Sequence, residues 1–192
     1  MKTVVVVGTS PIQVALSWAL SRLSYDVIIS GKDYKDSMSA RNMIRSAGGK
    51  AEIVQPVFNM LSSLYPKVVV SSDLIMTAHC MRASIACADM GGNVTDTATL
   101  AVDVCKIGKA PVFGDLGMVP NWSERLRTVN ADHHWTKMQK ALGFPAAAAV
   151  ASLAEGHLPR KRGLRSYSDI PSESYSEHLK KIESGRPLWR GL

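Results

Sequence analysis

Residues 3–30 read TVVVVGTSPIQVALSWALSRLSYDVIIS and combine two strand signals with one helix signal. The stretch begins with a run of valines, turns at a small polar segment after Gly8, continues with apolar residues at helical spacing and ends in a second β-branched run. Short, continuous apolar runs are typical of strands that are buried on both faces of a parallel sheet. The stretch therefore predicts a strand, a helix and a second parallel strand.

The same alternation continues along the chain. Apolar runs at 51–54, 67–72 and 110–114 predict further strands, and helical spacing recurs at 37–47, 74–86 and 95–107. Alternating strands and helices predict an α/β protein with a doubly wound parallel sheet. Ligands of such sheets bind at the carboxyl ends of the strands, so functional residues are expected in the loops that follow the apolar runs.

Composition limits the class of protein. With 192 residues, of which 46% are hydrophobic and 20% charged, the chain can bury one sizeable core. No uninterrupted apolar stretch approaches the roughly 18 residues of a membrane span, so we expect a cytoplasmic protein with no membrane contact. The three cysteines lack C-x-x-C spacing and are expected to be reduced and buried. The net charge of +7 is expected to be a solvated basic surface, and no nucleic-acid partner is predicted.

The turn after the first strand is a candidate phosphate site. In a dinucleotide-binding turn three glycines allow the tight turn, the approach of the diphosphate and close helix packing; here Gly8 fills the first place, and Ser10 and Gln13 fill the other two. The helix N-terminus still offers N–H groups and its dipole. An ordinary capped turn is the alternative. The predicted diphosphate-binding residues are Gly8, Thr9, Ser10, Pro11 and Ile12.

The end of the second strand bears on the choice of cofactor. Ser30, Gly31 and Lys32 are predicted to meet the adenosine ribose, and a hydroxyl with an ammonium group favours the 2′-phosphate of NADP. Asp33, which follows, keeps NAD open, because a carboxylate there bonds the free 2′-hydroxyl. The alternative for Lys32 is a solvated loop lysine.

Two later turns carry a resemblance to a known family. Residues 88–126 read ADMGGNVTDTATLAVDVCKIGKAPVFGDLGMVPNWSERL, with a D-x-G-G-N turn and a D-x-G-x-x-P turn. Together with the closing segment at 141–182, this pattern resembles the saccharopine dehydrogenase-like oxidoreductases of the lysine dehydrogenase type. The resemblance implies a Rossmann-like NAD(P)-binding fold, a short C-terminal helical extension, and oxidation or reduction of an amino acid or imino acid as small-molecule substrate.

The chain also departs from that family. Its members are longer and insert a substrate and dimerisation domain after the D-x-G-x-x-P turn, where this chain has only NADHHWTKMQK at 130–140. The family's P-G is Pro120-Asn121 here. We therefore expect an NAD(P)-binding domain over 1–130 and a shortened remnant of the substrate region with C-terminal helices over 131–192, and the substrate itself cannot be carried over.

Further cofactor-binding residues follow from the resemblance and from the fold. Ser71, Ser72 and Asp73, after the strand at 67–72, would flank the adenine or the nicotinamide ribose. Met90, Gly91, Gly92 and Asn93 would lie beside the nicotinamide ring, since glycines let the backbone approach it. A simple turn before a helix capped by Asn93 is the alternative for the glycine pair.

The reaction itself needs one residue that binds an amine or relays a proton. Asp89 and Asp115 follow predicted strands and are the candidate catalytic residues; caps of the following turns are their alternative role. His79, His133 and His134 are the groups that titrate near neutral pH, or are loop residues. No ligand spacing predicts a metal site.

Two hypotheses about function follow. One is a compact NAD(P)-dependent oxidoreductase that acts on a C–N bond, and the other is a non-catalytic nucleotide-binding or interaction protein with the same fold. An open sheet without its substrate domain predicts a homodimer that packs C-terminal segments, including the alanine-rich 146–153, between protomers. The alternative is that these alanines cover the sheet of their own protomer.

Overall fold

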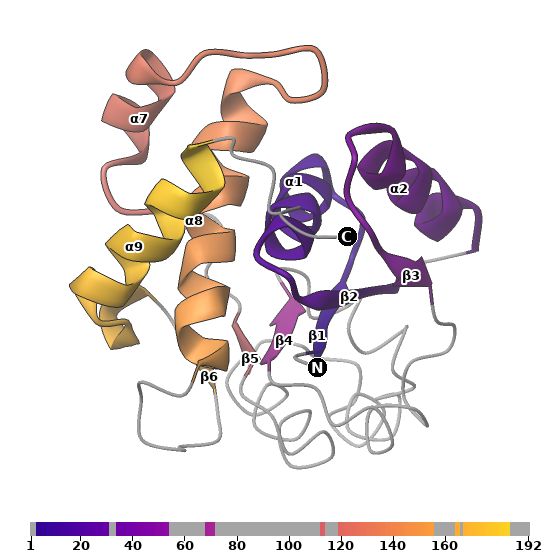
Figure 1. The fold of residues 1–192 in the computed structure, drawn as a ribbon, viewed down its shortest axis with the longest axis horizontal. Helices are drawn as coiled ribbons and strands as arrows, with labels where there is room; N and C mark the ends of the chain where they lie inside the picture. Colours follow the sequence, from indigo (N-terminus) through magenta and orange to yellow (C-terminus); the bar gives the residue numbers. More distant parts are fainter. Residues whose placement is uncertain are drawn as a thin grey trace, which may run out of the picture.

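The computed structural model describes residues 3–30, 34–53, 68–71, 112–113, 119–155, 164–165 and 167–184. Within these ranges the chain is a mixed α/β protein with a parallel sheet (Figure 1). Its strands are β1 (Thr3–Val7), β2 (Asp26–Ser30), β3 (Glu52–Ile53), β4 (Val68–Ser71), β5 (Val112–Phe113) and β6 (Leu164–Arg165). Its helices are α1 (Pro11–Arg22), α2 (Tyr34–Ser46), α7 (Trp122–Thr128), α8 (Lys137–Ala154) and α9 (Ser172–Glu183), with a 3₁₀ turn at Tyr167–Asp169.

The described strands pair in the order β3-β2-β1-β4-β5-β6, and every pair is parallel. The centre of the sheet is β2, β1 and β4, which have four or five residues each, whereas the three outer strands have two. The strands predicted from the five apolar runs are confirmed, as are the first two helices. The helices predicted at 74–86 and 95–107 lie outside the described residues.

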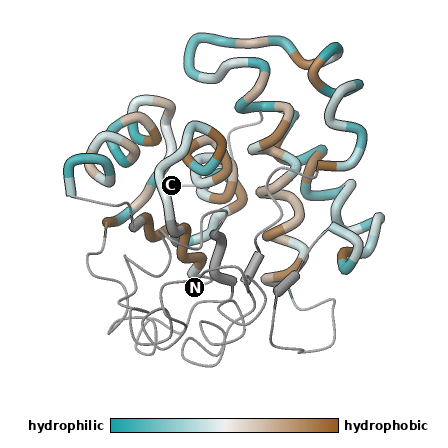
Figure 2. Tube along the Cα trace, turned by 180° about the vertical axis from the view of Figure 1, so that it is seen from behind, coloured by the Kyte–Doolittle hydropathy of each residue, from teal (hydrophilic) through white to brown (hydrophobic). Residues whose placement is uncertain are grey.

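Helix α8 packs directly on α1 (Figure 1). A Cβ atom on Gly143 would lie 2.9 Å from both the Ala15 Cβ atom and the Ile12 carbonyl oxygen, so the two helices approach as closely as a glycine allows. Val4 and Val6 of β1 belong to the same buried core as both helices. Figure 2 shows hydrophobic, brown segments in β1 and along the two helices.

The alanine-rich part of α8 is buried within its own chain. Ala146, Ala147, Ala148 and Ala149 have no exposed surface, because α1 and α9 both pack on α8. This is the alternative that the sequence left open, and these alanines offer no surface to a second protomer. Since α8 shares its core with β1 and β2, residues on both sides of position 130 build one hydrophobic core.

An aromatic cluster fixes the start of α8 against α1. The ring of Trp18 lies 5.5 Å from that of Trp135 and 5.3 Å from that of Phe144, centroid to centroid. The indole N–H of Trp18 donates to the Ala47 carbonyl at 2.8 Å, which ties α1 to the end of α2 as well. The cluster therefore joins α1 to the start of α8, and Trp18 also joins α1 to the end of α2.

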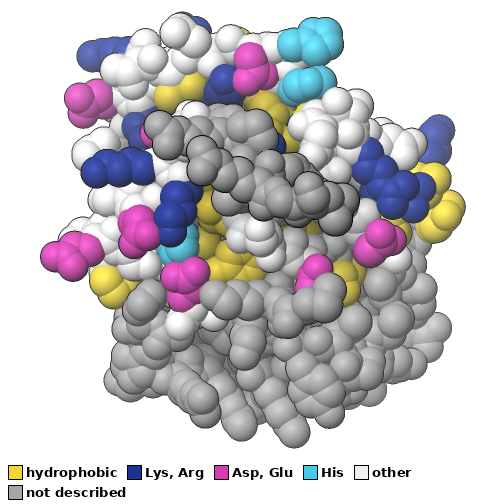
Figure 3. Space-filling model, in the orientation of Figure 1, with side chains coloured by type: hydrophobic (Ala, Val, Ile, Leu, Met, Phe, Trp, Pro, Cys, Tyr) yellow, Lys and Arg dark blue, Asp and Glu magenta, His cyan; other side chains and the backbone are white. Residues whose placement is uncertain are grey.

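Charged side chains of both signs alternate over the described part of the face in Figure 3, and no large area of one sign is seen there. None of the described helices has the length and apolar character of a membrane span.

Candidate functional site

Three strand ends meet in one row at the centre of the sheet. Val7, the last residue of β1, is in register with Ser30 at the end of β2 and with Ser71 at the end of β4. Neighbouring strands are about 4.8 Å apart, so the Cα atoms of the two serines lie roughly 10 Å apart on either side of β1. From β1 the chain passes to β2 and β3 on one side, and β4 follows on the other side, so the strand order reverses beside β1.

Gly8, which follows Val7, has a backbone conformation that favours glycine. Its φ is +117°, and the residue is buried. A Cβ atom there would lie 2.3 Å from the side-chain oxygen of Gln13 and 2.5 Å from its nitrogen. The amide of Gln13 thus occupies the space over the Gly8 backbone, and Gln13 is only 2% exposed.

A capping box closes the turn between β1 and α1. The Ser10 N–H donates to Oε1 of Gln13 at 3.1 Å, and the Gln13 N–H donates to Oγ of Ser10 at 3.3 Å. Pro11, the first residue of the helix, has no N–H to offer. Two of the donors that the first helical turn could offer to an anion are therefore already bonded within the turn.

The N-terminus of α8 lies beside the N-terminus of α1 and carries the same motif. The Thr136 N–H donates to Oε1 of Gln139 at 2.9 Å, and the Gln139 N–H donates to Oγ of Thr136 at 3.2 Å. Nε2 of Gln139 also donates to the Pro11 carbonyl at 3.3 Å, which joins the two helix starts. The positive ends of two helix dipoles therefore lie close together near the end of β1.

A dinucleotide diphosphate needs a close approach to the backbone and unpaired N–H donors. Gly8 allows the approach, and α1 directs its positive end to the row of strand ends. The N–H group of Ser10 becomes available only when the Gln13 side chain moves, and the N–H group of Gln13 only when the Ser10 hydroxyl turns away. The turn can therefore fit a diphosphate after rotation of the Gln13 and Ser10 side chains.

The structure thus brings some of the predicted site residues together. Gly8, Thr9 and Ser10 form the turn, Pro11 and Ile12 begin α1, and Ser30 and Ser71 flank the turn at the ends of the neighbouring strands. The others lie outside the described residues: Gly31, Lys32, Ser72, Asp73, His79, Asp89, Met90, Gly91, Gly92, Asn93 and Asp115.

His133 and His134 lie in the exposed loop before α8, with their rings edge to face at 4.9 Å. The Asp132 side chain, in the same loop, is held by hydrogen bonds and an ion pair. Its Oδ1 accepts the N–H groups of His134 and Trp135 at 2.8 Å each, and its Oδ2 lies 2.6 Å from Nζ of Lys140. Partial burial opposes ionisation, but the Lys140 ammonium and the two N–H groups hold the pKa of Asp132 below its ordinary value.

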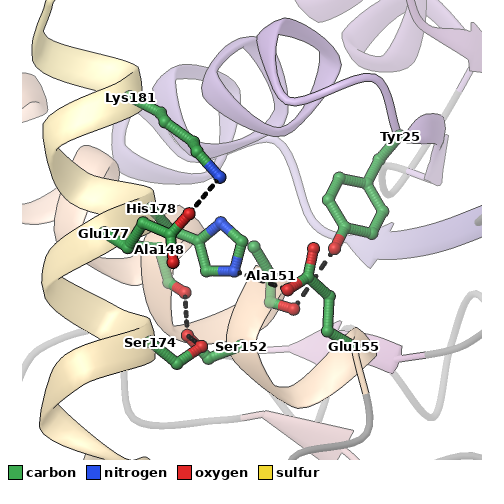
Figure 4. Close-up of polar contacts among 9 residues, drawn as sticks. All are labelled: Tyr25, Ala148, Ala151, Ser152, Glu155, Ser174, Glu177, His178 and Lys181. Atoms are coloured by element: carbon green, nitrogen blue, oxygen red, sulfur yellow. Dashed lines mark hydrogen bonds and ion pairs between the residues drawn. The ribbon is translucent and has the colours of Figure 1, made fainter.

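A second polar cluster joins the C-terminal end of α8 to α9 and to Tyr25, which precedes β2 (Figure 4). Nε2 of His178, which is 4% exposed, lies 3.1 Å from Oε2 of Glu155. The Glu155 carboxylate lies between the imidazole and the phenol of Tyr25, whose O–H donates to the Ala151 carbonyl at 3.2 Å. This cluster lies by the end of α8 opposite to the capped turns.

The Tyr25 phenol makes the free energy of unfolding depend on pH in the alkaline range. Burial raises its pKa well above the ordinary value of 10.0, and the Glu155 carboxylate adds to the rise. Above pH 10.0 the unfolded chain loses this proton while the folded chain retains it, so the contribution is complete below pH 10.0 and is lost as the pH rises further. We expect the free energy of unfolding, measured by urea titration, to fall above this pH and to fall less steeply in Tyr25→Phe.

At pH 7 the free energy of unfolding of Tyr25→Phe should be lower by about 1 kcal/mol, because the variant loses the hydrogen bond to the Ala151 carbonyl. Tyr34→Phe is the control for the loss of a tyrosine hydroxyl, because Tyr34 is 62% exposed. A pH dependence in Tyr25→Phe identical to that of the unchanged chain would contradict the assignment.

Gln13, Gln139 and His178 were not among the predicted functional residues. The S-x-x-Q and T-x-x-Q spacings at 10–13 and 136–139 are capping-box signals, and they could have identified the first two. No spacing signal marks His178. No group of His, Cys, Asp and Glu suited to a metal ion occurs in the part of the chain that the structure describes. Comparison of the chain with protein-family models and with curated proteins found no match.

Proposed function

We propose that this chain is a Rossmann-like NAD(P)-binding oxidoreductase that acts on the C–N bond of an amino acid or imino acid. The observation that carries the proposal is the position of the Gly8 turn. It follows β1 at the point where the strand order reverses, which is where open parallel sheets bind their ligands. The described order β3-β2-β1-β4-β5-β6 is also the order typical of dinucleotide-binding sheets.

Each part of the cofactor has proposed partners. The backbone of residues 8–12 would hold the diphosphate, and Ser30 with Lys32 would meet the adenosine ribose. Ser71 begins the segment proposed to flank the adenine or the nicotinamide ribose. The nicotinamide, when bound, supplies the hydride chemistry. Asp89 and Asp115 are proposed to orient the substrate amine and to relay its proton. The homodimer remains a prediction.

A charge-assisted contact to the 2′-phosphate would make the site prefer NADP. Lys32→Ala is expected to weaken NADPH binding by about 1–2 kcal/mol and to leave NADH binding nearly unchanged, since NADH has no 2′-phosphate. Calorimetric titration with each cofactor measures both affinities. Equal losses for the two cofactors would show that Lys32 does not recognise this phosphate.

The second candidate is a non-catalytic nucleotide-binding or interaction protein. The Ser10–Gln13 capping box favours it, because the box satisfies two donors of the turn without any ligand. The two candidates share a fold and differ in turnover, and an interaction protein would also lack cofactor binding.

Titration of the full chain with NADPH and with NADH, followed by nicotinamide fluorescence, tests the proposal. Saturable binding of either cofactor at one site per chain is the expected result. Binding of neither would remove the oxidoreductase proposal and leave the interaction protein. Binding without turnover of any amino or imino acid would favour a nucleotide-binding protein.

A further inference from the structure

We infer that Gln13 is an internal competitor of the cofactor diphosphate and sets the affinity of the site. Its side-chain amide lies over the Gly8 backbone, and its oxygen accepts the hydrogen bond from the Ser10 N–H that a phosphate oxygen would otherwise accept. The inference rests on the proposed NAD(P) site and adds the means by which that site is opened and closed.

The Gln13 amide lies where the diphosphate would approach the backbone. A dinucleotide-binding turn reserves the position of Gln13 for a glycine, so that helix and strand pack closely. Here the side chain folds back instead and lies over the Gly8 backbone, 2.3 Å from the position of an added Cβ atom. A ligand that approaches the backbone at Gly8 therefore meets this amide first.

The Gln13 amide also takes one backbone donor of the turn. Oε1 of Gln13 accepts the Ser10 N–H at 3.1 Å, and the Gln13 N–H is bonded to Oγ of Ser10 at 3.3 Å. An amide oxygen is a neutral acceptor, whereas a phosphate oxygen is charged and makes the stronger hydrogen bond. A diphosphate should thus displace the side chain, at the cost of the bond that it breaks.

The second capping box of the chain provides an internal comparison. Thr136 and Gln139 make the same pair of hydrogen bonds at the start of α8, at 2.9 Å and 3.2 Å. That box follows an exposed loop instead of a central strand and does not cover Gly8. A substitution in it should affect helix stability in the same way without uncovering the diphosphate site.

Gln13→Ala removes the competitor, and Thr136→Ala is its matched control. We expect both variants to unfold at lower temperature than the unchanged chain, because each loses a capping box. Only Gln13→Ala should bind NADPH more tightly, by about threefold to tenfold, the worth of one hydrogen bond. Calorimetry with NADPH and thermal unfolding without ligand provide the two readouts.

Gln13→Glu tests the same idea in a chain that keeps its cap, because glutamate also completes a capping box. Its carboxylate would hold the Ser10 N–H more strongly and repel the diphosphate. We expect NADPH affinity to fall by about tenfold or more. Affinity equal to or greater than that of the unchanged chain would overturn the inference, including in the case that Gln13→Ala does not fold.

The outcomes separate this inference from the proposed function. Binding by the unchanged chain, with equal or weaker binding by folded Gln13→Ala, would overturn the role of Gln13 and leave the cofactor site intact. Binding by Gln13→Ala alone would support both. Binding of neither NADPH nor NADH by either form would overturn both.

Discussion

Replacement of Gly143 by valine is expected to lower the free energy of unfolding by about 3 kcal/mol. An added Cβ atom would lie 2.9 Å from the Ile12 carbonyl oxygen and 3.2 Å from the Leu16 nitrogen. Both are backbone atoms of α1, so they cannot move aside as a flexible side chain can. The two helices would have to separate, and the apolar contacts between them would be lost.

Gly48→Ala is the control for the general effect of replacing a glycine. The φ of Gly48 is +77°, and nothing lies within 4 Å of its added Cβ atom, so only backbone strain of about 1 kcal/mol is expected. Urea titrations of the two variants give the comparison. Similar losses in both would show that α1 and α8 are not packed as closely as described.

Gly8→Val is expected to abolish cofactor binding, with NADPH affinity lowered at least about a hundredfold, or about 2.8 kcal/mol. The φ of +117° would add roughly 1–3 kcal/mol of strain, and the side chain would both displace the Gln13 amide and cover the backbone that the diphosphate approaches. Calorimetry with NADPH and circular dichroism of the folded variant are the measurements.

Ser10→Gly is the companion variant for this turn. Glycine at an N-cap costs only a few tenths of a kcal/mol, and it removes the hydroxyl that occupies the Gln13 N–H. We expect its affinity for NADPH to equal or exceed that of the unchanged chain. If Gly8→Val folds and binds NADPH normally, the diphosphate site must lie elsewhere.

The central strands were predictable because each is a continuous β-branched run. Val4, Val5 and Val6 are fully buried, as a continuous apolar run predicts. The short strand β6 and the helix α7 were not predicted. Leu164 and Arg165 lie in a basic segment without a strand pattern, and α7 has no buried residue in its seven positions, so neither carries a periodic apolar signal.

The location of the candidate site could be predicted from the sequence, but the side-chain contacts that cover it could not. Gly8 after a valine run places a turn at the end of β1 from sequence alone. That the Gln13 side chain folds back over Gly8 depends on its rotamer, and the contact between Gln139 and Pro11 depends on how α8 docks on α1. The first is a rotamer within a turn of six residues, which the S-x-x-Q spacing permits but does not fix. The second follows from packing between segments more than 100 residues apart, which local patterns do not record.

Hydrogen–deuterium exchange of the full chain with and without saturating NADPH tests the central claim most directly. We expect slower exchange in peptides that cover residues 8–14 and the ends of β2 and β4, and no change in α9, which packs on α8. Unchanged exchange around Gly8, or protection confined to α9 and the Tyr25–Glu155–His178 cluster, would contradict a cofactor site at the reversal of strand order.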